Sequence, residues 1–361
     1  MSTYVMWERP LHQQGDPRTV AVADDCVVVH ERFSRLVCLE REDGSVRWDH
    51  PFGRWPRAVV AADGRCYGIA QDVDALSCRD LRSGAELWRA PLPGFTGHVA
   101  VAGDTVLVGG WRGYTPLQAF DTATGRPVWR TPRPVDTVLP LGLGDGTALL
   151  GAPGGAEVRR IRLGDGSRAE RVPLPGMLPD GDDRAVFSRA GGGRVLLCCD
   201  GGPVTELRFR TGARGFRTGT RARTLPVSGA AGPVSEAGGL LWLSGPKGFD
   251  VLDPADGTPL WRVEAGHRMA EGVVPVADGF LVAGTQGTLF RLGPTGEVAE
   301  RMTLGRRVAG LLPGFPAGAA GPAARAGQAF ALTKGTLVAL RAPGEAGEAG
   351  EAGDTAVARG D

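Results

Sequence analysis

The stretch Ala119-Phe-Asp-Thr-Ala-Thr-Gly-Arg-Pro-Val-Trp129 carries the pattern that decides the fold. Its second half, a small polar residue, a glycine and a tryptophan four positions later, recurs as DGSVRW at 43–48, SGAELW at 83–88 and DGTPLW at 256–261. Weaker copies keep the glycine and replace the tryptophan, as DGSRAE at 165–170, TGARGF at 211–216 and TGEVAE at 295–300. The seven glycines are 39 to 46 residues apart, which indicates one repeated structural unit.

Paired apolar or alternating runs precede each glycine, such as VAVAGDTVLVGG at 99–110 and VVPVADGFLVAG at 273–284. Hairpins of this kind begin near residues 20, 58, 98, 138, 185, 233, 273 and 308, and helical periodicity is nearly absent. Units of about four short strands at this spacing predict an all-β fold, an eight-bladed β-propeller of four-stranded antiparallel blades. One blade cannot cover both of its faces, so neighbouring blades must bury them.

The last hairpin, at 328–341, has no glycine turn and outer strand after it, unlike the seven before it. The missing strand is available at the other end of the chain, where VMWERPL at 5–11 resembles LWRAPL at 87–92. We therefore expect the N-terminal strand to complete the eighth blade and close the ring, which leaves no open sheet edge.

The large aromatic side chain of each repeat suits the wedge between neighbouring blades. The residues expected to pack in these wedges are Trp7, Trp48, Trp88, Trp129, Phe216 and Trp261. Glu170 and Glu300 occupy the same position in two repeats, where a weaker seam is expected. Residues 1–341 then form a single propeller domain, with a low-complexity insertion at 313–327, and residues 342–361 form a flexible low-complexity tail.

Composition narrows the classes of function. Forty-one basic residues against 40 acidic ones give a net charge of +1, which argues against nucleic acid or an anionic membrane surface as a partner. No apolar run approaches the roughly 18 residues of a membrane span, and no signal sequence is evident, so we expect a cytoplasmic protein with reduced thiols. The chain has two lysines and no asparagine, a bias typical of a bacterial high-GC genome.

The stretch 119–129 matches every fixed position of the consensus A-x-D-x-x-T-G-x-x-x-W, the tryptophan-docking motif of PQQ-like (quinoprotein-like) repeats. Residues 251–261 match a second copy at Asp253, Gly257 and Trp261, with Val251 in place of alanine. The chain thus resembles this family over roughly residues 4–341. The resemblance implies an eight-bladed propeller like those of quinoprotein dehydrogenases and BamB-type assembly lipoproteins, and it implies little about chemistry.

The same resemblance raises the question of a quinone cofactor. In some quinoprotein dehydrogenases a disulfide between adjacent cysteines packs on the quinone, and Cys198-Cys199 is such a pair. Calcium sites of that family also use an asparagine, which this chain lacks, and no C-x-x-C-H haem motif is present. We expect no cofactor and no PQQ. Cys26 and Cys66, like Cys38 and Cys78, are one repeat apart and are expected in the core, not in a metal site.

Ligand-binding candidates come from the placement of the histidines. In this fold, the connections between blades and the turns between the second and third strands lie on one face, and all five histidines fall in such segments of the predicted pattern. Imidazoles, carboxylates and aromatic rings near a channel mouth are what a ligand site needs. The candidates are His12, His30, His50, His98, His267, Trp55, Trp111, Asp72, Asp136, Asp183 and Glu271.

These observations leave two candidate functions for the protein. The first is a non-catalytic propeller that binds a small molecule, a peptide or a protein partner on the histidine-bearing face. The alternative is an enzyme of specialised metabolism, a lyase, isomerase or oxidoreductase, that uses a histidine–carboxylate pair at the channel mouth. No G-x-S-x-G, H-E-x-x-H or P-loop motif supports the second, so we favour the first. An aromatic rim would favour binding, whereas a histidine within hydrogen-bond reach of a carboxylate would favour catalysis.

Overall fold

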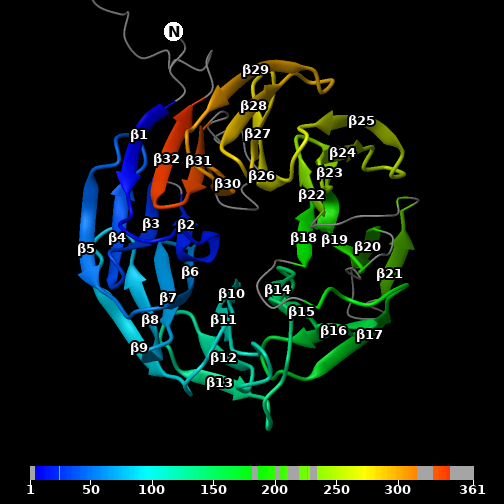
Figure 1. Cartoon of the computed structure of the whole chain (residues 1–361). Helices are drawn as coiled ribbons and strands as arrows, with labels where there is room; N and C mark the ends of the chain where they lie inside the picture. The colour runs from blue at the N-terminus through cyan, green and yellow to red at the C-terminus, as the bar shows by residue number, and fades with distance from the viewer. Residues whose placement is uncertain are drawn as a thin grey trace, which may run out of the picture.

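The strands lie in sheets around a central opening, and in each four-stranded sheet the first strand is nearest the centre and the last strand is at the rim (Figure 1). The computed structural model describes residues 5–23, 25–180, 186–200, 204–209, 219–225, 227, 234–314 and 328–341. Apart from the short 3-10 helices η1 (Pro17–Thr19) and η2 (Gly191–Gly193), the regular structure of these residues is β.

Six sheets of the described residues hold four antiparallel strands each, in chain order. They are β2 (Val20–Val22), β3 (Cys26–Glu31), β4 (Arg35–Glu40) and β5 (Val46–Pro51); β6 (Pro56–Ala62), β7 (Arg65–Ala70), β8 (Val73–Asp80) and β9 (Glu86–Pro91); β10 (Val99–Ala102), β11 (Thr105–Val108), β12 (Gln118–Asp121) and β13 (Pro127–Arg130); β14 (Leu141–Gly142), β15 (Thr147–Gly151), β16 (Glu157–Arg162) and β17 (Arg168–Pro173); β18 (Phe187–Ala190), β19 (Arg194–Cys198), β20 (Val204–Phe209) and β21 (Thr220–Thr224); and β22 (Val234–Ala237), β23 (Leu240–Ser244), β24 (Gly248–Leu252) and β25 (Pro259–Glu264). The architecture is therefore all-β and consistent with a β-propeller.

The remaining sheet has eight strands. It contains β26 (Met269–Val276), β27 (Gly279–Gly284), β28 (Thr288–Leu292) and β29 (Val298–Thr303), followed in the ring by β30 (Val308–Pro313), β31 (Gln328–Thr333), β32 (Thr336–Arg341) and β1 (Val5–Pro10). A single parallel bridge, between Glu271 and Gly310, joins the two groups of four. Glycine allows this approach, because a Cβ on Gly272 would lie 1.7 Å from the carbonyl oxygen of Leu311.

The two ends of the described chain meet in this sheet. β1 pairs antiparallel with β32, from Val5 opposite Leu340 to Pro10 opposite Thr336, and the two strands lie side by side in Figure 1. The predicted pairing of the N-terminal strand with the last strand is confirmed. The insertion falls between β30 and β31, as predicted, but residues 315–327 and the tail at 342–361 lie outside the described residues.

Indole rings lie between neighbouring sheets. Trp48 donates a hydrogen bond from Nε1 to the carbonyl oxygen of Leu81 at 2.8 Å, and it packs on Gly84 of the next sheet. That glycine has φ +71°, and a Cβ there would lie 2.7 Å from the indole, so only glycine fits. The same packing recurs for Trp7 on Gly44, Trp88 on Gly125, Trp129 on Gly166 and Trp261 on Gly296. Phe216 lies outside the described residues.

The repeat that carries Glu170 makes a different contact. The carboxylate of Glu170 accepts hydrogen bonds from the backbone N–H of Thr220 at 2.7 Å and from its hydroxyl at 2.6 Å. Because Thr220 begins β21, this pair joins two neighbouring sheets. The position that holds an indole elsewhere is filled here by a polar link.

Apolar clusters fill the spaces between the sheets. One of them contains Cys26, Cys38 and Cys66 with Trp48, while Cys78 is buried in the next cluster. These four cysteines lie in the core, as the repeat spacing predicted, and burial raises the pKa of the Cys78 thiol to about 11. Among the described residues, no helix has the length and apolar character needed to cross a membrane.

Candidate functional site

One side of the ring, called here the loop side, bears the connections between sheets and the turns between second and third strands. Hydrogen bonds join some of these segments to one another. The side chain of Gln13, in the segment before β2, accepts from the backbone N–H of Phe33 in the β3–β4 turn at 2.6 Å. The carbonyl oxygen of Trp55, in the β5–β6 connection, accepts from the N–H of Gln71 in the β7–β8 turn at 3.1 Å.

Four exposed aromatic side chains lie on the loop side. The exposed fractions are 65% for Phe33, 65% for Trp55, 56% for Phe95 and 55% for Tyr114. No other aromatic side chain of the described residues is exposed, and these four come from loops of three consecutive sheets, β2–β5, β6–β9 and β10–β13. We call these four residues the aromatic rim. Exposed aromatic groups gathered on one surface are typical of binding sites.

The backbone of the aromatic rim is strained. Phe33, Trp55 and Phe95 have φ of +61°, +49° and +60°, in the left-handed region that non-glycine residues rarely adopt. Such a conformation costs on the order of 1–3 kcal/mol per residue and persists where the surroundings impose it, often at functional sites. The structure therefore holds these rings outward at an energetic cost.

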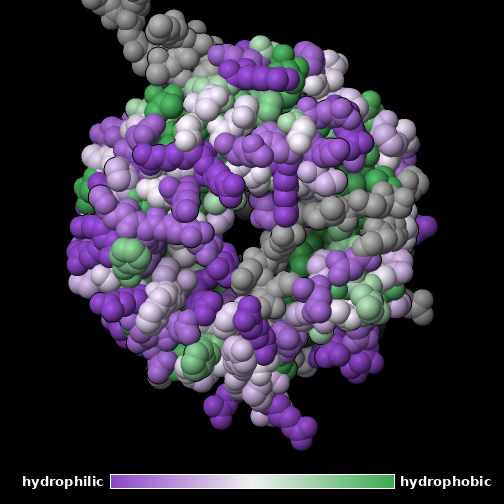
Figure 2. All heavy atoms as spheres, in the orientation of Figure 1, coloured by the Kyte–Doolittle hydropathy of each residue, from purple (hydrophilic) through white to green (hydrophobic). Residues whose placement is uncertain are grey.

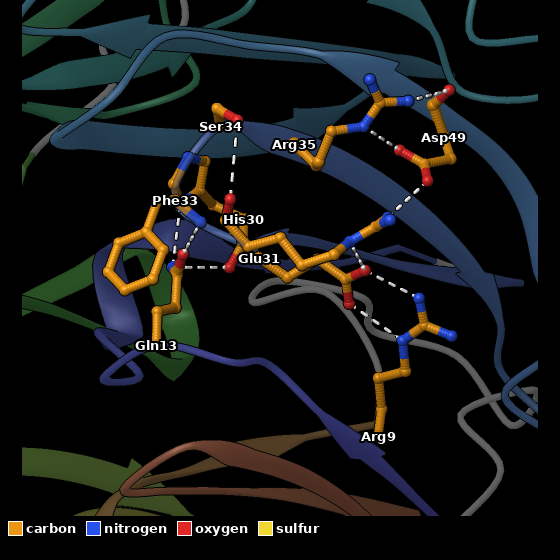
Figure 3. Close-up of polar contacts among 9 residues, drawn as sticks. Arg9, Gln13, His30, Glu31, Phe33, Ser34, Arg35 and Asp49 are labelled. Atoms are coloured by element: carbon orange, nitrogen blue, oxygen red, sulfur yellow. Dashed lines mark hydrogen bonds and ion pairs between the residues drawn. The ribbon is translucent and has the colours of Figure 1, made fainter.

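Gln13 and His30 form the base of the strained turn (Figure 3). The Gln13 amide donates to the carbonyl oxygen of His30 at 2.9 Å and to Nδ1 of the ring at 2.8 Å. Nδ1 must then be unprotonated, so Nε2 carries the proton and donates it to the carbonyl oxygen of Gly53 at 3.1 Å. Burial lowers the pKa of His30, which keeps the ring neutral.

A buried carboxylate ties the same turn to the N-terminal strand. Glu31, only 1% exposed, accepts two hydrogen bonds from Arg9 of β1 at 2.9 and 2.7 Å, and it pairs with Arg32 at 2.9 Å (Figure 3). The hydrogen bond to Glu31 raises the pKa of Arg9. Arg32 also pairs with Asp49, which in turn pairs with Arg35 at 2.7 Å. This chain of charges fixes the direction of the β3–β4 turn.

A cavity of about 650 Å³ opens between Phe33 and Trp55. Its lining includes Gln13, Asp16, His30, Arg32, Arg54 and Trp55. This volume lies in the range of ligand pockets, and Phe33 and Trp55 are among the residues that line it.

A second cavity, of about 480 Å³, lies in the central channel, because the strands that line it are the first strands of several sheets. It is lined by Asp16, Arg57, His98, Trp111, Leu139 and Glu271, and Asp16 also lines the cavity beside the aromatic rim. In Figure 2, the coloured residues that border the central opening are mostly hydrophilic. Arg57 and Arg112 lie 4.2 and 4.7 Å from the ring centre of the buried Trp111, so cation–π contacts hold this indole.

The structure brings together only part of the predicted set. His98, Trp111 and Glu271 line the channel cavity, and His30 and Trp55 line the cavity beside the aromatic rim. Asp72, Asp136 and His12 are exposed on the loop side, and His267 packs against Phe290 with a ring-centre distance of 6.4 Å. Asp183 lies outside the described residues.

Two histidines are not in the segments that the sequence pattern assigned to them. His50 lies inside the outer strand β5 and packs on Trp48, because that strand extends to Pro51. His30 lies inside β3, and its two ring nitrogens already have partners. Both predictions of a loop position were wrong, since each strand runs further than the alternation of apolar residues indicated.

Sequence reasoning missed Phe33, Phe95 and Gln13 as site residues. A signal was available for Phe33, because phenylalanine is uncommon in a short turn that favours glycine or asparagine. No signal marked Gln13, whose importance arises from a contact with a turn 20 residues away.

The adjacent cysteines do not fit a quinone-binding platform. Cys199 is buried in a cluster with Leu149 and Val186, whereas Cys198 is buried in another with Val204 and Val234. Successive side chains of a strand point to opposite faces, so the two thiols lie in separate inter-sheet cores instead of forming one surface toward the channel. Within the described part of the chain, no group of three or more His, Cys, Asp or Glu side chains is arranged to hold a metal ion.

A family model described as outer membrane protein assembly factor BamB matches residues 4–77 and 70–225 of this chain. A comparison with curated proteins gave no match. Among solved structures, BamB from Moraxella catarrhalis superposes with a TM-score of 0.68 at 15% identity, covering 94% of this chain and 99% of that one.

Two further solved structures are also similar in fold. Sqt1 from Saccharomyces cerevisiae gives a TM-score of 0.69 at 8% identity, covering 95% of this chain and 100% of that one. A europium-containing methanol dehydrogenase gives 0.63 at 12% identity, covering 94% and 93%. At these identities the likeness concerns the fold alone, so function has to be argued from the site.

Proposed function

Because this chain belongs to the family of PQQ-like propellers whose model is described as outer membrane protein assembly factor BamB, we propose that it is a non-catalytic protein that binds a protein partner through the aromatic rim. The observation that carries this proposal is the gathering of all exposed aromatic side chains of the described residues on the loops of three neighbouring sheets. A second support is the strained backbone at three of the four.

Pre-organisation favours binding. A side chain that is already held in its bound orientation loses little entropy when a partner docks. Gln13 and Glu31 hold the turn of Phe33, and Gln71 holds the connection of Trp55. Large aromatic side chains with few rotatable bonds are the residues that most often supply binding energy at protein interfaces.

Photo-crosslinking in cells tests this function. Benzoylphenylalanine would replace Phe33, Phe95 or Tyr114 in turn, with Leu87 and Val128 as control positions because they are exposed apolar residues of outer strands. We expect discrete protein adducts from the rim positions only, and we expect the Trp55→Ala substitution to abolish them without lowering the melting temperature. Equal adducts from the control positions, or none from the rim, would contradict the proposal.

An enzyme is the second candidate, because His98 and Glu271 line the same channel cavity. In that case His98 would act as acid or base toward a small molecule in the channel. A hydrogen bond from Nε2 of His98 to the carbonyl oxygen of Thr137 at 3.0 Å positions the ring there. A screen of small alcohols, lactones and enolisable ketones, with His98→Ala as the comparison, would reveal such an activity, and turnover that His98→Ala removes would favour it over binding.

We also propose that the ring counts as eight blades, in which β26–β29 form one blade and β30–β32 with β1 form another. The single bridge between Glu271 and Gly310 supports this count, since every other strand pairing within the two groups of four joins at least four residue pairs.

A further inference from the structure

Two carboxylates lie among the residues of the aromatic rim. Asp72, in the β7–β8 turn, is close to the Gly53-Arg54-Trp55 connection, since a Cβ on Gly53 would lie 2.5 Å from the Asp72 Oδ1. Asp74 is close to the Gly94-Phe95 connection, where a Cβ on Gly94 would lie 3.4 Å from its Oδ1. The two carboxylates therefore lie between the loop that carries Trp55 and the loop that carries Phe95.

Neither carboxylate is neutralised. Asp72 and Asp74 are exposed, and the structure gives their side chains no ion pair or hydrogen bond to any residue it describes. Several other carboxylates of these sheets have arginine partners, such as Asp49 with Arg35 and Glu86 with Arg89. Arg54 is next to Trp55 in sequence, yet it forms no ion pair with either aspartate among the described residues.

Taking the proposed function as its premise, we propose that the aromatic rim binds an extended protein segment in which a lysine or arginine is flanked by apolar side chains. The cation would pair with Asp72 and Asp74 and also lie near the faces of the aromatic rings, to which cations are attracted. The flanking apolar side chains would cover Trp55 on one side and Phe95 with Tyr114 on the other. The ring centres of Phe95 and Tyr114 are 6.1 Å apart, so they form one apolar contact area.

Charge complementarity selects this class of partner over an acidic one. An acidic segment would place its carboxylates beside Asp72 and Asp74, and like charges in contact oppose association. Nucleic acid is disfavoured for the same reason, since its phosphates would meet the two aspartates.

A displayed library of random 12-residue peptides, selected on the full-length chain, tests the inference. The strongest selected peptide is then synthesised and its affinity measured by fluorescence anisotropy. We expect the selected sequences to contain a lysine or arginine between apolar residues. The Asp72→Asn, Asp74→Asn double variant should bind that peptide about tenfold more weakly, and so should Trp55→Ala.

Two control variants test whether binding depends on negative charge at the rim and on the loop side of the ring. Asp63→Asn alters an exposed aspartate in the β6–β7 turn, at the other end of the same sheet, and should change the affinity less than about twofold. Arg54→Gln removes a neighbouring positive charge, so it should leave binding unchanged or strengthen it. Circular dichroism would check that each variant remains folded.

The outcomes separate the two proposals. Peptides that require Trp55 but lack basic residues, or that are unaffected by the double aspartate variant, would overturn this inference and leave the proposed function in place. Acidic peptides whose binding Arg54→Gln weakens would also overturn it. If no selected peptide depends on Trp55, both the inference and the proposed function fail.

Discussion

The seam that Trp48 fills and the seam that Glu170 fills occupy the same position of the repeat and have opposite chemistry. Trp48 is 6% exposed and combines the burial of a large apolar surface with one hydrogen bond, to Leu81. Glu170 buries little apolar surface and instead accepts two hydrogen bonds from Thr220. The first seam depends on the hydrophobic effect, whereas the second depends on directional, charge-assisted bonds.

This difference in chemistry predicts that the sheets are joined most firmly at the seams filled by tryptophan. The aromatic rim lies on sheets β2–β5, β6–β9 and β10–β13, whose seams are filled by Trp48 and Trp88. A strained loop persists only when its surroundings hold it. We infer that the tryptophan-filled seams supply the rigid support that the rim requires, and the expectation of a weaker seam at Glu170 remains a prediction.

Removal of the closing strand should have the largest effect. Deletion of residues 1–10 removes β1, the indole of Trp7 and the Arg9 partner of the buried Glu31. Because both a seam and a buried ion pair are lost, we expect a decrease in stability of more than about 5 kcal/mol, comparable with the whole stability of a typical domain. Urea unfolding followed by circular dichroism measures it. An unchanged midpoint would show that the ring does not depend on closure by β1.

Substitution of a tryptophan between two sheets should have the second-largest effect on stability. Trp48→Ala leaves a cavity between two sheets and removes the indole hydrogen bond to the carbonyl oxygen of Leu81, so it should lower the free energy of unfolding by about 3–5 kcal/mol. Val46→Ala is the control, because Val46 is an exposed residue of the same strand and should cost less than about 0.5 kcal/mol. Equal effects of the two substitutions would refute the seam role of the indole.

The carboxylate seam should prove weaker. Glu170→Ala removes the hydrogen bonds to Thr220, and we expect a loss of about 1.5–3 kcal/mol, less than for Trp48→Ala. Glu264→Ala changes an exposed glutamate of another outer strand and serves as the control, with an effect within about 0.5 kcal/mol. The comparison of seams fails if Glu170→Ala costs more than Trp48→Ala.

Acidification should have the smallest effect on stability, and it should act through protonation of His30. Burial lowers the pKa of His30 in the folded state, so the unfolded chain takes up a proton first as the pH falls through about 6.5. The stability contributed by the neutral ring is complete above that pH and is lost progressively below it. Urea unfolding at pH 7.5, 6.5 and 5.5 should show this loss, and His30→Asn should show a smaller slope. An identical slope in the variant would exclude His30 as the cause.

Local repeat chemistry made much of the fold predictable. The glycine at position 125 and its counterparts in the described repeats have a left-handed backbone, and the tryptophan four residues later needs an apolar wedge, so both leave a fixed spacing in the sequence. The pairing of β1 with β32 followed from the missing outer strand of the last hairpin. By contrast, the parallel bridge at Glu271 could not be predicted, because it depends on how closely two glycine-containing inner strands approach.

The sequence predicted which loops carry the candidate site, but not which of their side chains are exposed. Trp111 and Trp55 both lie in such loops, yet Trp111 is buried against Gly97 under Arg57, whereas Trp55 is turned outward by a left-handed backbone. Apart from Arg112, which follows Trp111 directly, the contacts that bury Trp111 come from other segments of the chain, so the loop sequences alone do not distinguish the two cases.

The sequence by itself determined the repeat, the strand order and the joining of the chain ends, because these depend on spacing and on residue types within each unit. Only the tertiary structure decided which loop side chains form the aromatic rim, and that Asp72 and Asp74 lie within it without an ion partner among the residues that the structure describes. The physical reason is that burial, strain and charge pairing at a loop are set by residues 20 or more positions away, such as Gln13 beneath Phe33.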